Sequence, residues 1–328
     1  MKKRRGLIWL VGYLAGVLII RFWFGPRSEM NWFTYEMVHN GILFFVPLGV
    51  FLVVVGLFKR RFLPYALLIL CANWLIFADP IIRIPMPPSR KDDLRVVSYN
   101  VAHGWIDIAG VRKVLAESSP DIVCLQESAV DPKEIESSTR VLARRLGYKY
   151  FVQESFNGIL SRYPLRLENV IDVPTKWGKK TFPEVVISTP EGDVRVISVH
   201  LEPSWIAGWP PDLSEWKPTL SKVVVDRRSQ AEMVLARVRL SKEPVIVAGD
   251  FNGPPYTEVP TRFRQEMTDS FAAVGGGCGM SLLPKLPYQR IDFAFVKGLK
   301  PQSAVVVDSN ASDHRPAQFD FSFHSVAK

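Results

Sequence analysis

The sequence contains little cysteine. Its three cysteines, Cys71, Cys124 and Cys278, form no C-x-x-C pair, and their number is too small and odd for a disulfide framework. A thiolate metal site is therefore not expected. Cys124 lies in the apolar run 122–125, where cysteine usually acts as a small core residue, so we expect packing rather than chemistry from it.

Most of the chain also lacks an excess of either charge. Residues 1–91 hold twelve Lys and Arg and three Asp and Glu, and residues 92–328 hold the remaining 29 of each sign. The net charge of +9 therefore belongs to the N-terminal segment. The rest has no overall basic footprint for nucleic acid, although a balanced total leaves a local basic patch open. The sequence shows no internal repeat and no low-complexity segment.

Long apolar runs fill the first ninety residues. They cover about 7–24, 39–58 and 62–78, and each is close to the roughly 20 residues that a helix needs to cross a bilayer. No small-x-small cleavage site follows the first run, which favours a retained anchor over a signal peptide. We therefore expect a membrane anchor over residues 1–91, with three transmembrane helices and a Pro-rich linker at its end.

Basic residues near the ends of these runs predict the orientation. Residues 2–5 and 59–61 are basic, whereas the loop between the first two runs holds only Arg27 with two glutamates. The positive-inside rule places both basic clusters in the cytoplasm. Three spans then put the chain after Asp79 in the periplasm or outside the cell. If the third run does not insert, this orientation is reversed.

Residues 92–328 predict one α/β domain in which strands and helices alternate. Period-two alternation and short apolar runs indicate the strands, and apolar residues at helical spacing indicate the helices. We expect strands at 94–99, 121–125, 148–153, 157–161, 183–188, 194–201, 244–248, 290–296, 303–308 and 317–323, and helices at 108–117, 134–146 and 224–240.

Polar residues follow the ends of several predicted strands. They are Asn100, Glu127, His200, Asp250, Asn252, Asp313 and His314. The ends of strands are where an α/β sheet usually places a site. A single Asn or Asp in such a position is more often a turn or helix cap. Seven of them at successive strand ends predict a functional site.

Short motifs around these residues occur in a characteristic order. They are Ser98-Tyr99-Asn100, Leu125-Gln126-Glu127, Asn157-Gly158-Ile159-Leu160-Ser161-Arg162, Val199-His200-Leu201, Arg227 with Gln230, Gly249-Asp250-Phe251-Asn252, Arg290-Ile291-Asp292-Phe293 and Ser312-Asp313-His314-Arg315-Pro316. Together they resemble the endonuclease/exonuclease/phosphatase superfamily over roughly residues 94–323. The resemblance implies a DNase I-like fold, a four-layer α/β sandwich, here preceded by three transmembrane helices. The third motif departs from the family pattern, because Phe156 stands where Gly is usual and Gly158 where Ala is usual.

The resemblance implies a divalent-metal-dependent phosphoesterase. Glu127 would be the principal metal ligand, and Asn100 and Asp313 would contribute further oxygens. Carboxylate and amide oxygens suit a hard cation, so we expect Mg²⁺, with Mn²⁺ as the second candidate.

The same resemblance implies the catalytic roles. Asp250 would orient or deprotonate the attacking water, and Asn252 would hold the geometry. His314 and His200 would stabilise the phosphoryl oxygens. Asp292 would hold His314 in one tautomer and raise its basicity.

A tryptophan-rich segment separates His200 from Arg227. It contains Trp205, Trp209 and Trp216 together with four prolines. One interpretation is a surface loop that packs on itself. The other is a loop that contacts lipid or substrate, because tryptophan favours the bilayer interface and the domain is tethered to a membrane.

Three functions follow from these observations. The first is hydrolysis of a lipid-linked phosphate or pyrophosphate at the outer face of the membrane. Three spans before this domain resemble membrane-bound relatives associated with glycopeptide resistance, which act on undecaprenyl pyrophosphate. The second is a membrane-tethered endonuclease or exonuclease, which the missing basic excess disfavours. The third is a non-catalytic binding module, which the intact motifs disfavour.

Overall fold

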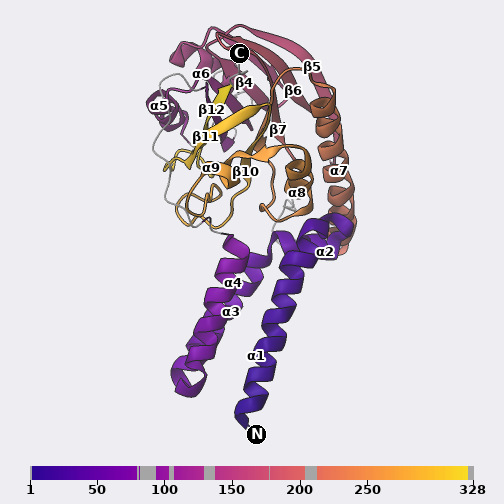
Figure 1. The fold of residues 1–328 in the computed structure, drawn as a ribbon, viewed down its shortest axis with the longest axis vertical. Helices are drawn as coiled ribbons and strands as arrows, with labels where there is room; N and C mark the ends of the chain where they lie inside the picture. The colour runs from indigo at the N-terminus through magenta and orange to yellow at the C-terminus, as the bar shows by residue number, and fades with distance from the viewer. Residues whose placement is uncertain are drawn as a thin grey trace, which may run out of the picture.

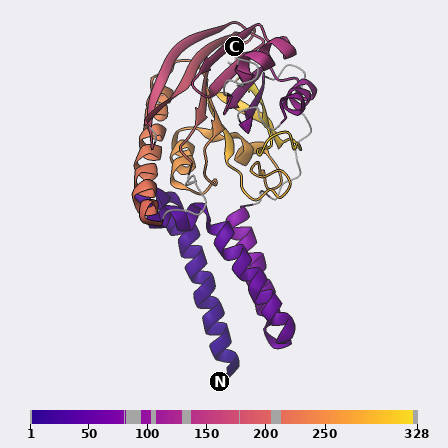
Figure 2. The same ribbon diagram turned by 180° about the vertical axis from the view of Figure 1, so that it is seen from behind.

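The computed structural model describes residues 2–79, 81, 94–102, 107–128, 137–176, 178–203 and 213–323. Apolar helices project from one end of an α/β domain (Figures 1 and 2). The Pro-rich linker expected after Asp79 lies almost entirely outside the described residues.

The N-terminal segment forms the expected long apolar helices. They are α1 (Lys2–Leu18), continued by the π-helical turn η1 (Ile19–Phe24) and the 3-10 turn η2 (Gly25–Met30), and then α3 (Gly41–Phe58), the turn η3 (Arg60–Phe62) and α4 (Leu63–Ala78). Three stretches are long and apolar enough to cross a membrane, namely Ile8–Met30, Gly41–Phe58 and Arg60–Ala78. A short helix, α2 (Trp32–His39), connects the first two and starts at a capping box on Asn31.

Small and polar residues hold these helices together. Gly49 lets the backbone of α3 approach Leu70 of α4, since a Cβ there would lie 2.9 Å from the Leu70 Cα. Asn73 of α4 donates to the carbonyl of Phe45 in α3 (2.6 Å) and accepts from the Tyr13 hydroxyl in α1 (3.1 Å). The start of α1 and the α3–α4 turn both lie at the end of the molecule farthest from the domain (Figure 1).

The domain contains two six-stranded sheets. The first has the order β11-β12-β1-β2-β4-β3 and the second β5-β6-β7-β8-β10-β9. The strands of the first are β1 (Leu94–Asn100), β2 (Ile122–Gln126), β3 (Tyr150–Glu154), β4 (Asn157–Ser161), β11 (Leu299–Val306) and β12 (Ala317–Phe323). Those of the second are β5 (Leu165–Thr175), β6 (Gly178–Thr189), β7 (Gly192–His200), β8 (Val245–Asp250), β9 (Thr268–Asp269) and β10 (Asp292–Lys297).

Helices cover the outer face of each sheet. Alternate residues of the strands point between the sheets, where Val96, Val196 and Phe319 belong to one buried cluster. The other faces pack on α5 (Ile108–Ser118) and α6 (Ser138–Leu146) for the first sheet, and on α7 (Leu213–Leu240) and α8 (Glu258–Glu266) for the second. The short helix α9 (Ser270–Val274) contacts β10 and β11. These layers confirm the predicted four-layer α/β sandwich.

Several predicted boundaries were wrong. β5 was not predicted, because its sequence mixes polar and apolar residues and ends near Pro174. β6 begins at Gly178 instead of 183, since it pairs with β5 from its first residue. Helix α7 begins at Leu213 rather than 224 and continues through Pro218. Packing of Leu220 and Val223 against Tyr35 of α2 stabilises this additional length.

Candidate active site

The strand register brings the predicted site residues to one edge of the sandwich. In the second sheet His200 at the end of β7 lies opposite Asp250 at the end of β8, and Asp250 lies opposite Asp292 at the start of β10. In the first sheet Asn100 ends β1 opposite Gln126, the residue before Glu127. The ends of central strands from both sheets therefore meet at one place.

The backbone at this edge is constrained at three positions. A Cβ at Gly249 would overlap the carbonyl of Val199, so only glycine allows β7 and β8 to pair directly before Asp250. Glu127 and Asn252 have φ values of 53° and 47°, in the left-handed region that non-glycine residues rarely adopt. Such conformations cluster at functional sites, where the surrounding structure holds them.

Asn100 lies between the two principal carboxylates. Its amide nitrogen is 3.1 Å from Glu127 Oε1 and 3.1 Å from Asp250 Oδ2, and its amide oxygen accepts from the amide of Ala102 at 3.0 Å. Asn100 and Asp250 are buried, whereas 26% of the Glu127 side chain is exposed. Glu127 therefore faces the solvent side of the site.

Asp250 is fixed in place by its neighbours. Its Oδ1 accepts from the amide of Asn252 at 2.8 Å, and the Asn252 side chain in turn donates to the carbonyl of Leu201 at 2.9 Å. Burial raises the pKa of Asp250 above its ordinary value, and the nearby Asp292 carboxylate adds to this rise. A carboxylate with a raised pKa is a better proton acceptor, which suits a general base near neutral pH.

His314 and Asp292 form a buried pair beside Asp250. His314 Nδ1 is 2.9 Å from Asp292 Oδ2, and His314 Nε2 is 3.7 Å from Asp250 Oδ2. Burial opposes the charged imidazolium, but the carboxylates of Asp292 and Asp250 outweigh it and raise the pKa of His314. The bond to Asp292 orients the ring, so that Nε2 points toward Asp250.

The remaining predicted residues also lie near this edge. His200 Nε2 is 3.8 Å from both Glu127 Oε1 and Asp250 Oδ2. Asp313 is exposed, and Ser312 connects it to the site, because the Ser312 hydroxyl lies 2.8 Å from the carbonyl of Asn100 and 3.2 Å from Asp313 Oδ1. The structure thus places all eight predicted catalytic and metal-binding residues together.

The donor set of this edge fits a divalent cation. Glu127 Oε1 and Asp250 Oδ2 both lie 3.1 Å from the side-chain nitrogen of Asn100, and carboxylate oxygens that converge in this way can bind Mg²⁺ or Mn²⁺. Asp250, Asp292 and His314 form a second potential ligand group, whose atoms lie within 4.8 Å of one another. Within this second group the hydrogen bond to Asp292 at 2.9 Å fixes the orientation of the His314 ring.

Lys180 is a nearby residue that the sequence analysis did not select. It lies on β6 with 15% of its side chain exposed, 3.9 Å from Glu202 Oε2. Burial lowers its pKa to about 8, and the charges of Glu202, Asp250 and Glu127 act in the opposite direction. No motif marks this lysine. Only the pairing of β6 with β7 brings it to the end of the strand that carries His200.

Of the three tryptophans in the tryptophan-rich segment, the structure describes Trp216. This residue lies in α7 and not in a loop. It is half-buried and packs with Leu220, Val223 and Tyr35 of α2. Trp205 and Trp209 lie outside the described residues.

A buried ion pair supports the strand that carries Asp292. Arg290 donates through both Nη atoms to Asp269 at 2.9 and 3.0 Å, and both side chains are almost fully buried. Burial opposes ionisation of Asp269, but the Arg290 guanidinium outweighs it and lowers the pKa of Asp269.

We expect Asp269→Asn to lower the free energy of unfolding by about 3 kcal/mol at pH 7, because it leaves the Arg290 charge buried without its counter-ion. Urea unfolding of the full chain in detergent measures the effect. The folded-state pKa lies below the ordinary 3.8, so the pair's contribution is present above that pH and is lost as the pH falls through the folded-state pKa. Asp308→Asn is the matched control, since Asp308 pairs with Arg315 while 82% exposed, and we expect less than about 1 kcal/mol there. Equal stability of both variants would contradict the supporting role of Asp269.

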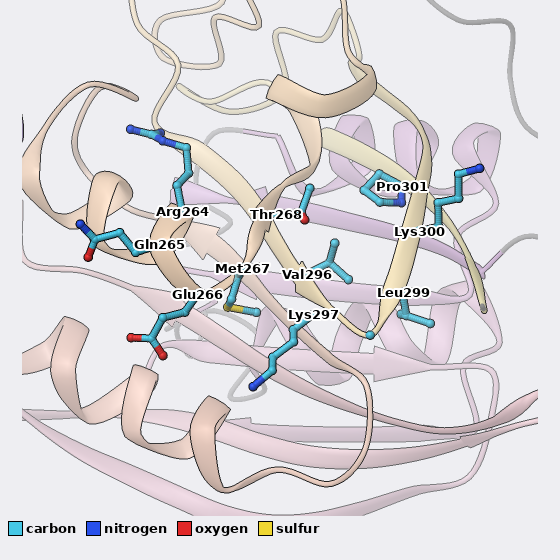
Figure 3. Close-up of a pocket in the computed structure, with 11 residues that line it drawn as sticks. Arg264, Gln265, Glu266, Met267, Thr268, Val296, Lys297, Leu299, Lys300 and Pro301 are labelled. Atoms are coloured by element: carbon cyan, nitrogen blue, oxygen red, sulfur yellow. The ribbon is translucent and has the colours of Figure 1, made fainter. Parts of the chain in front are cut away.

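A cavity of about 470 Å³ opens elsewhere, between α8 and the β10–β11 turn (Figure 3). Residues 264–268 and 296–301 line it. Lys297, at the opposite end of β10 from Asp292, is one of them. None of the predicted site residues lines this cavity, so it is separate from the candidate active site.

Residues 97–314 match the model of the Endonuclease/Exonuclease/phosphatase family. The chain belongs to this family. Its members hydrolyse phosphate esters and are generally dependent on divalent metals, which agrees with the carboxylate, amide and imidazole groups gathered at the sheet edge. No curated protein matches the sequence.

Solved structures share the fold of the domain. An endonuclease/exonuclease/phosphatase from Beutenbergia cavernae is 21% identical with a TM-score of 0.52, covering 70% of this chain and 72% of its own. TDP2 of D. rerio, complexed with a single-strand DNA product, is 19% identical with a TM-score of 0.53 and coverages of 71% and 100%. The catalytic domain of human nocturnin, with bound sulfate, is 19% identical with a TM-score of 0.50 and coverages of 73% and 96%.

Proposed function

We propose that this protein is a membrane-anchored, divalent-metal-dependent phosphoesterase that hydrolyses a lipid-linked phosphate or pyrophosphate. The catalytic domain would lie at the outer face of the cell membrane, with residues 2–5 and 59–61 in the cytoplasm. The family and the site support the phosphoester chemistry. A different observation supports a lipid-linked substrate.

That observation is the contact between the active-site loop and the membrane helices. Tyr256, six residues after Asp250, lies with its ring 3.9 Å from the guanidinium of Arg21 in η1, the turn that follows α1. Its hydroxyl is 3.4 Å from the carbonyl of Val38 and 3.5 Å from that of Phe77 in α4. The loop after β8 therefore rests on the ends of the apolar helices. A substrate whose tail lies in the bilayer would have its phosphate close to this edge.

In the proposed reaction, each residue of the site has one role. Asp250, held by Asn100 and the amide of Asn252, accepts a proton from the attacking water. His314, oriented by Asp292, and His200 donate hydrogen bonds to the phosphoryl oxygens. Glu127, Asn100 and Asp313 would hold the cation, which when bound neutralises phosphate oxygens and stabilises the leaving group.

A membrane-tethered nuclease is the second candidate. It is favoured by the shared fold with D. rerio TDP2, whose structure contains a DNA product. The equal numbers of acidic and basic residues in 92–328 disfavour it, because nucleic-acid binding draws on an excess of positive charge.

One assay separates the two. The full chain in lipid nanodiscs is offered a polyprenyl pyrophosphate, a phosphodiester lipid and plasmid DNA in parallel, first with Mg²⁺ and then with EDTA. We expect hydrolysis of the lipid substrates only, which gives inorganic phosphate from the pyrophosphate or a phosphomonoester from the phosphodiester, with its loss on metal removal and its absence in His314→Ala. Cleavage of DNA alone would replace the proposal with the nuclease. Turnover that survives EDTA would refute the metal dependence.

A further inference from the structure

Residues 25–40, which include the end of the first apolar stretch and α2, pack directly on the catalytic loops. A Cβ on Gly253 would lie 3.0 Å from His39 Nε2 and 3.1 Å from Arg227 Nη2. The side chain of Gln289 donates to the carbonyl of His39 at 2.6 Å. The amide of Glu258 donates to the hydroxyl of Ser28 at 3.0 Å. This segment therefore contacts the loop that follows Asp250 and the loop that precedes Asp292.

Arg227 of α7 connects the two strand ends that carry His200 and Asp250. Its Nη1 donates to the carbonyl of Glu202 at 2.6 Å, and its Nη2 donates to the carbonyl of Phe251 at 3.0 Å. Phe251 lies directly between Asp250 and Asn252, and Glu202 lies two residues after His200. The position of one planar guanidinium therefore fixes the spacing of these two loops.

The guanidinium itself is held by the membrane anchor. Arg227 is fully buried, and its Nε donates to Glu29 Oε1 at 2.9 Å, from a carboxylate that is also fully buried. The ring of Tyr35 lies 5.7 Å from the guanidinium carbon, and His39 Nε2 lies 3.8 Å from Glu29 Oε1. A buried cation needs a counter-ion close by, and Glu29 provides it from 198 residues earlier in the chain.

We infer that Glu29 is a positioning residue of the active site, acting through Arg227 on the loops after His200 and Asp250. The anchor then completes the catalytic domain in addition to tethering it. The inference rests on the proposed function, since it concerns the rate of that reaction. Glu29 does not contact the proposed catalytic groups, so its loss should alter the geometry of the reacting groups more than the binding of substrate.

The test compares Glu29→Gln with Glu36→Gln in the full chain in nanodiscs. Glu36 is the matched control, because it lies in α2 of the same segment and accepts a hydrogen bond from its neighbour Asn40. We expect Glu29→Gln to lower kcat by about tenfold to a hundredfold, since small displacements of reacting groups have effects of this size, with KM changed less than about threefold. Glu36→Gln should retain the kcat of the unaltered protein.

Thermal unfolding shows whether each variant is folded at the assay temperature. The kcat of each variant is also measured on a soluble chromogenic phosphodiester. If Glu29→Gln is folded at the assay temperature and keeps its kcat, the inference is overturned. If it is unfolded, Arg227→Lys is measured instead, which keeps the positive charge but cannot span both carbonyls. A lowered kcat in that folded variant supports the inference, and an unchanged kcat overturns it. Absence of turnover by the unaltered protein on every substrate would remove the proposed function, and the inference with it.

Discussion

Replacing Asp250 with Asn should lower kcat by roughly two to four orders of magnitude, the usual contribution of a positioned general base. The change removes the proton acceptor but keeps the shape of the side chain and its contact with the Asn252 amide. Steady-state turnover of the lipid substrate measures the loss. Circular dichroism and the unfolding temperature should stay near those of the unaltered protein.

Asp172→Asn is the control for this experiment. Asp172 lies exposed on β5, so the same chemical change there should leave kcat within about twofold, as surface substitutions usually have little effect. If Asp250→Asn kept more than a tenth of the original kcat, the base would have to be another group.

The second large effect is expected at Glu127. Glu127→Gln removes the negative charge from the solvent side of the site while keeping the side-chain volume, and should raise the Mg²⁺ concentration for half-maximal rate by at least about tenfold to a hundredfold. That range is typical for residues that only support a metal ligand, so a direct ligand should reach or exceed it. Rate measurements across a Mg²⁺ titration, together with calorimetry using Mn²⁺, give the affinity.

Glu117→Gln is the matched control on α5, since 66% of its side chain is exposed. It should leave the metal titration unchanged. An altered kcat with an unchanged metal affinity in Glu127→Gln would argue that Glu127 contacts substrate or water and does not bind the cation. High Mg²⁺ should restore part of the rate of Glu127→Gln, but none of the rate of Asp250→Asn. The two variants therefore separate metal binding from proton transfer.

The shared fold explains why the sequence predicts so much of this site. Each motif is short and lies where a buried strand ends, so the pattern that predicts the strand also locates the functional residue at or near its end. Asn100, His200 and Asp250 are all of this kind. The parallel pairing of β1 with β2 and of β7 with β8 then gathers such residues at one edge.

The long-range partners could not be predicted in this way. Arg227 belongs to a motif, but its counter-ion Glu29 lies in a segment that the sequence analysis treated only as a loop between spans. Lys180 is one of several lysines and has no distinguishing neighbours in the sequence. Both acquire their roles from the packing of segments that are far apart along the chain.

By itself, the sequence determined the apolar stretches, the order of most strands and helices, and which polar residues follow the strand ends, because each depends on residues within one turn or one strand. The tertiary structure alone decided where the apolar N-terminal helices meet the domain. It also decided the length of α7, whose first turns are stabilised by Tyr35 of α2, and the pairing of Glu29 with Arg227. These features depend on burial shared between distant segments, and no local pattern of residues encodes such burial.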